Sequence, residues 1–553
     1  MPVALELHAP LTAGESDWRA GWNSLPRWAR WLALGLSGLA ALALCAQFLV
    51  YVHYTGALLR FPFDYDQGEG FELYDTVLHA QGRWPYQDSQ VFPFYTSIYP
   101  PVFHLLTVPL VWLFGPQLWT GRLVGFAASL VAAGALAWAI RRETGRGVIG
   151  ALAGLTFLAS NYTFAIGPLF RQHMSMVLFE TLAIVTLAGF EWPSQTRAAA
   201  AAPGSPARAA RLDPRLFWGL FFLLAAGYTK PLAIATVIAG LGYLFLRGPR
   251  QAVLAGLALA LAAGGLFAWL NWQTDGWWYI SIIRANINAY DPAQTLAFFR
   301  EWFELHAVVI GAALAYGVSE LSARRPSAYT VWFGAAAANG LLSGKFGAGE
   351  SYFVTATAAA CVCAGLGAAR LWNAAERGRL TPAWAGLAVV LALPALSLVQ
   401  TRLTLHVYTD GPVYGPLARL LGVSDNSGRG YYDSQGYTQL GPRPTRADIE
   451  AGYKIVAWAQ AAPGPVFSEE AGFLFAAGKP IVTNPFVQLV MYQAGLFDPA
   501  EEIRQIEQRA FGLVILRAQF YPPPVLAALG AHYQPAADIA LNGFTYHLLQ
   551  PRP

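Results

Sequence analysis

The chain has 553 residues, of which 55% are hydrophobic and 12% are charged, and its formal net charge is +4. Soluble globular proteins carry roughly 25% charged residues, so this composition excludes an ordinary soluble domain and is typical of a polytopic α-helical membrane protein. The basic residues are dispersed, which argues against a nucleic-acid partner. The three cysteines lie inside apolar runs and predict neither disulfides nor a metal site.

The N-terminal segment, residues 1–30, is polar and carries Arg27 and Arg30 directly before the first apolar stretch. That stretch, 31–54, has about the length of a full membrane span and is longer than the apolar part of a signal peptide, so we expect an uncleaved first helix. The positive-inside rule places residues 1–30 in the cytoplasm and the residues after the first helix outside.

An acid-rich stretch over residues 60–101 follows the first span. The next apolar run, 102–114, is short for a span, and we predict an interfacial or re-entrant helix there. Residues 55–117 then form one external loop, which we expect to be catalytic. The acids of the stretch are Asp64, Asp66, Glu69, Glu72, Asp75 and Asp88.

Further spans follow from hydrophobicity and from the side on which arginines fall. Two short runs, 215–228 and 231–246, predict short helices that meet at the outer face near Lys230, because the following proline disfavours a continuous helix. The linker 192–214 carries three arginines and is expected to be cytoplasmic. The other spans, which bring the total to about 11, are expected near 118–140, 148–168, 174–191, 251–271, 305–321, 328–343, 351–371 and 383–400.

The composition changes after the predicted transmembrane domain, residues 31–401. Residues 402–553 contain no span and have ordinary levels of Asp, Glu, Asn and Pro. Because the last span is expected to end outside, these residues predict a small extracytoplasmic α/β domain. Its expected strands lie at 465–468, 480–483, 513–516 and 545–548, and its expected helix at 499–509.

Four external basic residues near span ends stand out, because the positive-inside rule disfavours cations there: Arg171, Lys230, Arg284 and Lys345. A lipid-linked phosphate at the outer face would explain them through charge-assisted hydrogen bonds. Lys230 could equally snorkel to the interface. Arg284 follows the aromatic run 277–280, which is typical of an interfacial helix, so a lipid-headgroup contact competes there.

The acids beside these cations suggest proton transfer. Asp66 and Glu69 are three residues apart and would share a face if a helix begins near Gly68, although Asp66 could equally be a helix N-cap. A carboxylate can deprotonate an acceptor hydroxyl while cations stabilise a departing phosphate. The sequence assigns no certain cofactor. Glu350 could bind a divalent metal together with the loop acids, but no cluster with metal-ligand spacing supports such a site.

Several segments carry a family resemblance. DYDQGEG (64–70), QGRWPYQD (81–88) and YPPV (99–102) resemble the first external loop of GT-C glycosyltransferases, in particular bacterial proteins similar to protein O-mannosyltransferases and lipid A aminoarabinose transferases. YTKP, which contains Lys230, and KFGAGESYF (345–353) resemble later segments of the family. Ser351 stands where relatives have Asn, and His173 stands where an acid is usual.

The resemblance implies a GT-C fold in the bacterial inner membrane and inverting transfer of a hexosyl or pentosyl group from a polyprenyl-phosphate donor to an extracytoplasmic lipid, glycan or protein. Asp66 matches the catalytic acid best, and the choice among Asp66, Glu69 and Asp64 stays open. Phosphate binding falls to the four outer cations. The aromatic residues implied in substrate binding are Tyr86, Tyr99 and Tyr352.

Two other classes of function compete. A transporter or flippase of a lipid-linked saccharide would place charged or helix-breaking positions in matched halves near mid-membrane, and the sequence shows no such symmetry. An assembly protein acting through residues 402–553 would not need acids crowded in a distant loop. Membrane lipid is an expected partner, while the sugar, the acceptor and the oligomeric state are left open.

Overall fold

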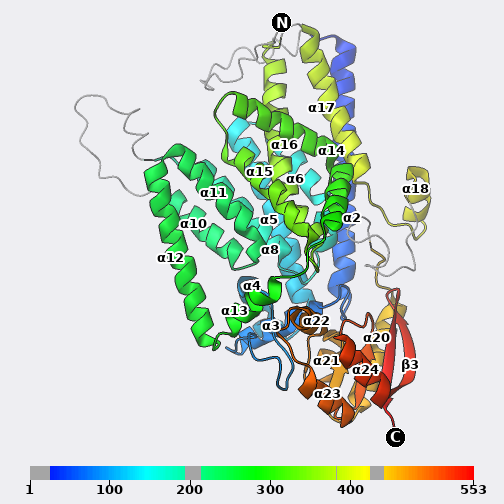
Figure 1. Cartoon of the computed structure of the whole chain (residues 1–553). Coiled ribbons are helices and arrows are strands. Elements are labelled where there is room, and N and C mark those ends of the chain that lie inside the picture. Colours follow the sequence, from blue (N-terminus) through cyan, green and yellow to red (C-terminus); the bar gives the residue numbers. More distant parts are fainter. Residues whose placement is uncertain (1–24, 193–212, 381–382, 424–440) are drawn as a thin grey trace.

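The computed structural model describes residues 25–192, 213–380, 383–423 and 441–553. A helical bundle occupies most of the chain, and a small sheet with its own helices lies at one end of it (Figure 1). Most of the predicted N-terminal segment and most of the 192–214 linker lie outside the described residues. The predictions for those two stretches therefore stay predictions.

The first elements agree closely with the sequence prediction. The long helix α2 (Arg27–Arg60) is followed by α3 (Glu69–Ala80), α4 (Val102–Phe114) and α5 (Leu118–Thr144). Gly68 takes a φ of +90° directly before α3, a conformation that glycine adopts without steric cost. The helix start predicted near Gly68 is therefore correct. Asp66 does not cap it, because Gly68 occupies the N-cap position.

The remaining bundle helices are α6 (Gly147–Leu158), α7 (Asn161–Ile166), α8 (His173–Ala188), α10 (Pro214–Gly227), α11 (Ile234–Arg247), α12 (Pro249–Gln273), α13 (Trp277–Ile282), α14 (Pro292–Ser322), α15 (Ala328–Asn339), α16 (Val354–Glu376), α17 (Ala383–Leu403) and α18 (Tyr414–Leu421). Short 3₁₀ turns, η1 (Pro231–Ala233), η2 (Arg284–Asn286), η3 (Gly340–Gly344) and η4 (Glu350–Phe353), join some of them. The two short helices expected on either side of Lys230 are α10 and η1 with α11.

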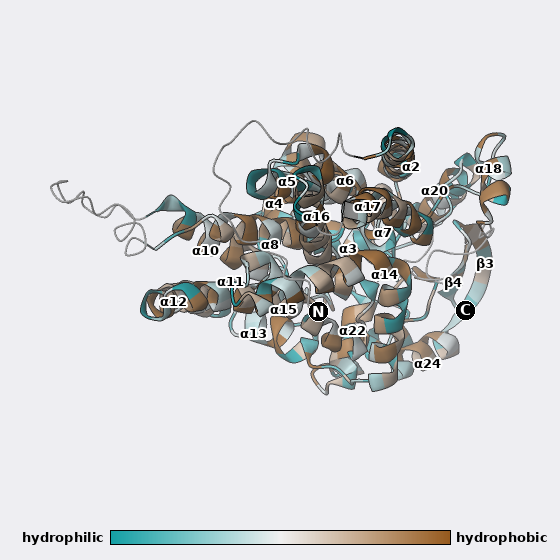
Figure 2. Cartoon of the chain, turned by 90° about the horizontal axis from the view of Figure 1, so that it is seen from above, coloured by the Kyte–Doolittle hydropathy of each residue, from teal (hydrophilic) through white to brown (hydrophobic). Residues whose placement is uncertain are grey.

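Six helices in the described part of the chain are long and apolar enough to cross a membrane, and five apolar helices are shorter. The outer helix α12 shows why the chain needs lipid around it: Leu254 and Leu261 are 66% and 76% exposed. Figure 2 shows hydrophobic residues on helices throughout the bundle. The chain is therefore a helical membrane protein, as predicted.

Two predicted spans have different boundaries. The single span expected at 148–168 is interrupted, because α6 ends at Leu158 and α7 starts at Asn161. Helix α14 begins at Pro292, well before the expected residue 305. The Asp291 side chain accepts a hydrogen bond from the Ala293 amide, and proline is favoured at the first helical position, so this N-terminus is well specified.

The C-terminal residues form the expected α/β arrangement. The sheet order is β1-β2-β4-β3, with β1 and β2 parallel and the other pairs antiparallel. The strand predicted at 480–483 is wrong: only Thr483 makes an isolated bridge, to Phe94. The elements are α20 (Arg446–Ala461), β1 (Val466–Ser468), α21 (Gly472–Ala477), α22 (Pro485–Gln493), α23 (Ala500–Glu507), β2 (Leu513–Leu516), α24 (Pro523–His532), β3 (Tyr533–Leu541) and β4 (Phe544–Pro551).

The acid-rich loop lies between the bundle and this α/β part. Asp64 joins them: its Oδ1 accepts from the Gly70 amide at 2.6 Å and its Oδ2 from the Gly472 amide at 2.9 Å. A Cβ atom on Gly472 would lie 2.1 Å from Asp64 Oδ2. Only glycine lets the start of α21 approach the carboxylate so closely.

Replacing Gly472 with alanine should therefore destabilise the protein by about 1–3 kcal/mol, since the added methyl group displaces a buried carboxylate. The measurement is the thermal unfolding midpoint of the full chain in detergent. Gly530→Ala is the control, because nothing lies within 4 Å of a Cβ there. Equal midpoints for the two variants would contradict the proposed clamp.

Candidate active site

A cavity of about 890 Å³ opens where the acid-rich loop, the bundle and the α/β part meet. Its wall is unusually charged for a membrane protein whose sequence is only 12% charged. The charged side chains in the wall are Glu72, Asp75, Arg171, Lys230, Lys345, Glu350 and Arg517. They come from segments far apart in the sequence, so the fold assembles this site.

Three of the four predicted phosphate-binding cations line this cavity: Arg171, Lys230 and Lys345. Arg284 is exposed and is not among the described wall residues. Two asparagines of the same segment, Asn286 and Asn288, line the cavity instead. The structure thus brings three of these cations together and leaves the fourth outside.

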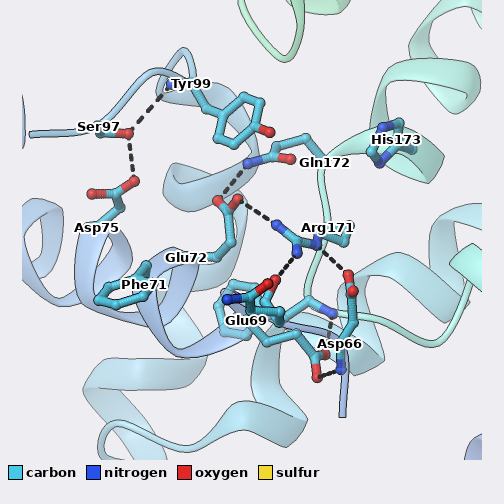
Figure 3. A network of polar contacts seen from close by, with 12 residues as sticks. Asp66, Glu69, Phe71, Glu72, Asp75, Ser97, Tyr99, Arg171, Gln172 and His173 are labelled. Atoms are coloured by element: carbon cyan, nitrogen blue, oxygen red, sulfur yellow. Dashed lines mark hydrogen bonds and ion pairs between the residues drawn. The ribbon is translucent and has the colours of Figure 1, made fainter. Parts of the chain in front are cut away.

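Arg171 sits at the centre of the polar network in Figure 3. Its Nε lies 2.6 Å from Asp66 Oδ2, and its Nη1 lies 3.2 Å from Glu72 Oε1. Its Nη2 donates to the Gln67 carbonyl oxygen. Arg171 lines the cavity whereas Asp66 does not, so the guanidinium stands between Asp66 and the cavity.

Lys230 approaches the cavity from the turn between α10 and η1. Its Nζ lies 2.5 Å from His173 Nε2 and 5.3 Å from the centre of the Tyr99 ring. Burial lowers the pKa of Lys230 to about 7, and the nearby charges of Arg171 and Lys345 act in the same direction, while Glu72 opposes them. An anion in the cavity would favour the protonated form.

Both carboxylate oxygens of Glu69 are occupied by hydrogen bonds that stabilise the loop. Arg122, a fully buried residue of α5, binds it bidentately, with Nε to Oε1 at 2.9 Å and Nη2 to Oε2 at 2.7 Å. The Phe170 and Tyr65 amides also donate to its oxygens. Burial opposes ionisation of Glu69, but the charge and hydrogen bonds of Arg122 outweigh it and keep the pKa below its ordinary value.

The other two predicted acids differ from each other. Both oxygens of Asp64 are taken by the Gly70 and Gly472 amides, and burial raises its pKa to about 6. Asp66 is also buried, but its Oδ1 has no hydrogen-bond partner within the described ranges of the chain. Asp66 alone of the three predicted acids therefore keeps an unengaged oxygen next to the cavity.

Two of the three predicted substrate-binding tyrosines line the cavity, and the third does not. Tyr99 and Tyr352 line the cavity. Tyr86 is buried outside the wall, where its hydroxyl donates to the Tyr99 carbonyl at 2.8 Å and its ring packs edge-on against Trp278 at 4.8 Å. Tyr86 supports Tyr99 in this structure and does not face the cavity.

Glu72 and Asp75 belong to the predicted group of loop acids, but the sequence indicates no role for them. The spacing Glu69, Glu72, Asp75 follows one face of α3 and could have revealed them. Burial raises the pKa of Glu72 to about 7 against the opposing charge of Arg171, and burial with the neighbouring Glu72 raises that of Asp75 well above its usual value. Together with His104 they form the metal-compatible group found among the described residues, which does not include Glu350.

The α/β part also contributes to the wall, through Asn484 and Arg517. Arg517 follows directly after β2, and its Nη1 lies 2.7 Å from Glu470 Oε1. The only signal in the sequence is its place at the end of a buried strand, LVILR. No sequence pattern indicates that this strand end meets a membrane-embedded bundle.

The fold is similar to that of ArnT from Cupriavidus metallidurans. The structure of ArnT bound to undecaprenyl phosphate matches with a TM-score of 0.56 and 14% identity, covering 93% of this chain and 98% of that one. The apo structure of ArnT matches with a TM-score of 0.54 and 13% identity, covering 92% and 98%. AglB from Archaeoglobus fulgidus, in complex with an inhibitory peptide and a dolichol-phosphate, gives a TM-score of 0.47 at 12% identity, covering 94% and 74%.

No protein-family model matches the chain, and no curated protein matches it by sequence. At such low identity the likeness to ArnT concerns the fold. It nevertheless extends over almost the whole length of both chains. The chain therefore has the fold of ArnT, which agrees with the fold that the resemblance of the loop motifs implied.

Replacing Glu69 with glutamine should destabilise the protein by about 3–5 kcal/mol, because it leaves the buried Arg122 guanidinium without a counter-charge. Glu304→Gln is the matched control: Glu304 pairs with Arg300 on the surface, where both side chains are mostly exposed, and an exposed pair contributes about 0–1 kcal/mol. Thermal unfolding in detergent compares the two variants. A Glu69 variant as stable as the control would show that the buried pair does not hold the loop.

Proposed function

Starting from the GT-C fold, we propose that this protein is a membrane glycosyltransferase that moves a sugar from a polyprenyl-phosphate donor to an acceptor. The observation that carries the proposal is the convergence of Arg171, Lys230 and Lys345 on one cavity beside the loop acids. These cations come from three separate connections of the bundle, and a shared anionic ligand gives them a common purpose.

In this proposal the cavity end of the bundle faces the extracytoplasmic side of the bacterial inner membrane. Residues 31–401 form the transmembrane domain, in which the shorter apolar helices complete about 11 spans, and residues 402–553 form the external domain. The ion pairs Arg146–Glu376 and Arg370–Glu320 join helix ends that the positive-inside rule assigns to the cytoplasm.

The donor phosphate binds against the three cations. ArnT was crystallised with undecaprenyl phosphate, a lipid of this class, and shares the fold of this chain. As the bond between sugar and phosphate breaks, negative charge grows on the departing phosphate, and preformed cations stabilise that charge more in the transition state than in the ground state. Tyr99 and Tyr352 supply aromatic surfaces next to the bound sugar.

Asp66 is proposed as the base that takes the proton from the acceptor hydroxyl. It lies behind Arg171, and one of its oxygens is unengaged. When a phosphate binds, it competes for the Arg171 guanidinium, so the pairing that screens Asp66 weakens and the carboxylate becomes available. Attack by the acceptor oxygen opposite to the departing phosphate then inverts the anomeric centre. The transferred group is a hexose or a pentose.

The transporter alternative fits this arrangement less well. Transporter sites lie near the middle of the bilayer between structural repeats. The charged cavity lies where the bundle meets the α/β part, which supplies Asn484 and Arg517 to its wall. A cavity wall to which the α/β part contributes fits a reaction at the membrane surface better than a transport site inside the bilayer.

Asp66→Asn should lower the turnover number about 10²–10⁴-fold, the usual contribution of a general base, while donor binding is retained. The assay measures transfer from a panel of polyprenyl-phosphate sugars by the full chain in lipid nanodiscs. Asp88→Asn is the control, because the Asp88 carboxylate accepts a hydrogen bond from the Gln90 amide and Asp88 is not among the described wall residues. Unchanged turnover in the Asp66 variant would move the role to another loop acid.

Donor affinity should depend on the protonation of Lys230. Its pKa of about 7 means that the ammonium is charged below that pH and neutral above it. Binding of a polyprenyl phosphodiester should therefore be strongest below pH 7 and weaken by up to about tenfold per pH unit above it. Lys230→Arg keeps the charge and should flatten this slope. Identical slopes for the two proteins would show that protonation of Lys230 does not control donor binding.

A further inference from the structure

Three buried side chains beside the cavity form a group that neither the transfer reaction nor the phosphate site explains. They are Glu72 and Asp75 on α3 and His104 on α4. Each offers one ligand atom, and the three atoms lie within 4.8 Å of one another. His104 is fully buried, while both carboxylates are about 3% exposed and line the cavity.

The hydrogen bonds of Thr76 define which nitrogen of His104 faces the acids. The Thr76 hydroxyl donates to the Glu72 carbonyl oxygen at 2.9 Å, so its proton is already used. Toward His104 Nδ1, 3.1 Å away, Thr76 Oγ1 can therefore only accept. This requires a proton on Nδ1 and leaves Nε2 of the neutral imidazole with a lone pair.

That lone pair is directed at two carboxylates. His104 Nε2 lies 3.5 Å from Glu72 Oε2 and 3.8 Å from Asp75 Oδ2, and it has no hydrogen-bond partner in the parts of the chain that the structure describes. Three acceptor atoms that face one another in a buried place repel each other unless something positive lies between them. The two distances are too long for good hydrogen bonds to a shared proton.

The same distances suit a shared metal ion. With ligand distances near 2.1 Å, tetrahedral coordination separates neighbouring ligand atoms by about 3.4 Å. The surrounding bonds also orient each ligand: Thr76 holds the imidazole, Ser97 and Tyr95 donate to Asp75 at 2.5 and 2.7 Å, and Gln172 donates to Glu72. Such supporting contacts are typical of metal ligands.

We propose that Glu72, Asp75 and His104 bind a divalent cation of the Mn²⁺ or Zn²⁺ type. One imidazole and two carboxylates match the preferences of these ions. Three protein ligands leave at least one coordination position open, and because Glu72 and Asp75 line the cavity, that position faces it. The open position can take water or an anionic oxygen of a ligand. The cation site does not depend on the transfer reaction, since binding alone defines it.

The test uses the full-length protein in nanodiscs after treatment with a chelator. Mn²⁺ is titrated and followed by electron paramagnetic resonance, and Zn²⁺ competes in a second titration. We expect one ion per chain. Pulsed measurements on the unmodified protein should show coupling of bound Mn²⁺ to the nitrogen of one histidine, a readout that needs no variant.

Variants then locate the site. His104→Ala should weaken binding by about 100-fold, and Thr76→Val, which removes the hydroxyl that orients the imidazole and leaves all three ligands in place, by about 10–100-fold. His547→Ala is the control, because it removes a histidine–carboxylate pair at the surface, His547 with Asp538 at 2.8 Å. Binding of neither ion to the unmodified protein, or equal binding by the His104 and His547 variants, would overturn the proposal. In either case the phosphate-binding experiments remain valid, so the two proposals fail separately.

Discussion

The fully buried ion pair between Glu69 and Arg122 is the interaction on which the site depends. Arg122 donates to both oxygens of Glu69 and also to the carbonyl oxygens of Leu58, Phe61 and Phe63. One guanidinium thus ties the end of α2, the start of the acid-rich loop and helix α5 together. The Phe170 amide completes the set and places the residue that follows it, Arg171, opposite the loop. A pair buried so completely is favourable only because nearly every polar atom in it has a partner.

The loop acids therefore divide into two kinds. Glu69 and Asp64 have their oxygens taken by backbone amides and by Arg122, and they determine the shape of the loop and its contact with the α/β part. Asp66, Glu72 and Asp75 lie around Arg171 or in the cavity wall, where chemistry can occur. Clustered acids in a sequence look equivalent. In the structure, the first kind is held in hydrogen bonds that fix the shape of the loop, and this shape positions the second kind.

Much of the architecture was predictable because it follows from hydrophobic length and local turn chemistry. The bounds of α4 were predicted to the residue, and the break near Lys230 followed from one proline. The sequence also indicated three cations that converge, because a basic residue on the outer side of a membrane needs a reason. What it could not supply was long-range pairing. Arg122 lies in a helix that was predicted only as a span, and Arg517 is distant from every motif. His104 resembles any polar residue in a short apolar helix until α3 is packed against it.

The charges around the cavity explain why so many titratable groups coexist there. Arg171 is shared between Asp66 and Glu72, and the Lys230 ammonium loses part of its stability to Arg171 and Lys345. Arg171, Lys230 and Lys345 are therefore held near one another, and Asp66 and Glu72 are partly compensated by Arg171, which an incoming anion would also attract. An anionic ligand relieves the repulsion among the cations and at the same time withdraws Arg171 from the acids. In the proposed reaction, donor binding and release of the base are therefore one electrostatic event, because the ligand that fills the cavity also draws Arg171 away from the carboxylates beside it.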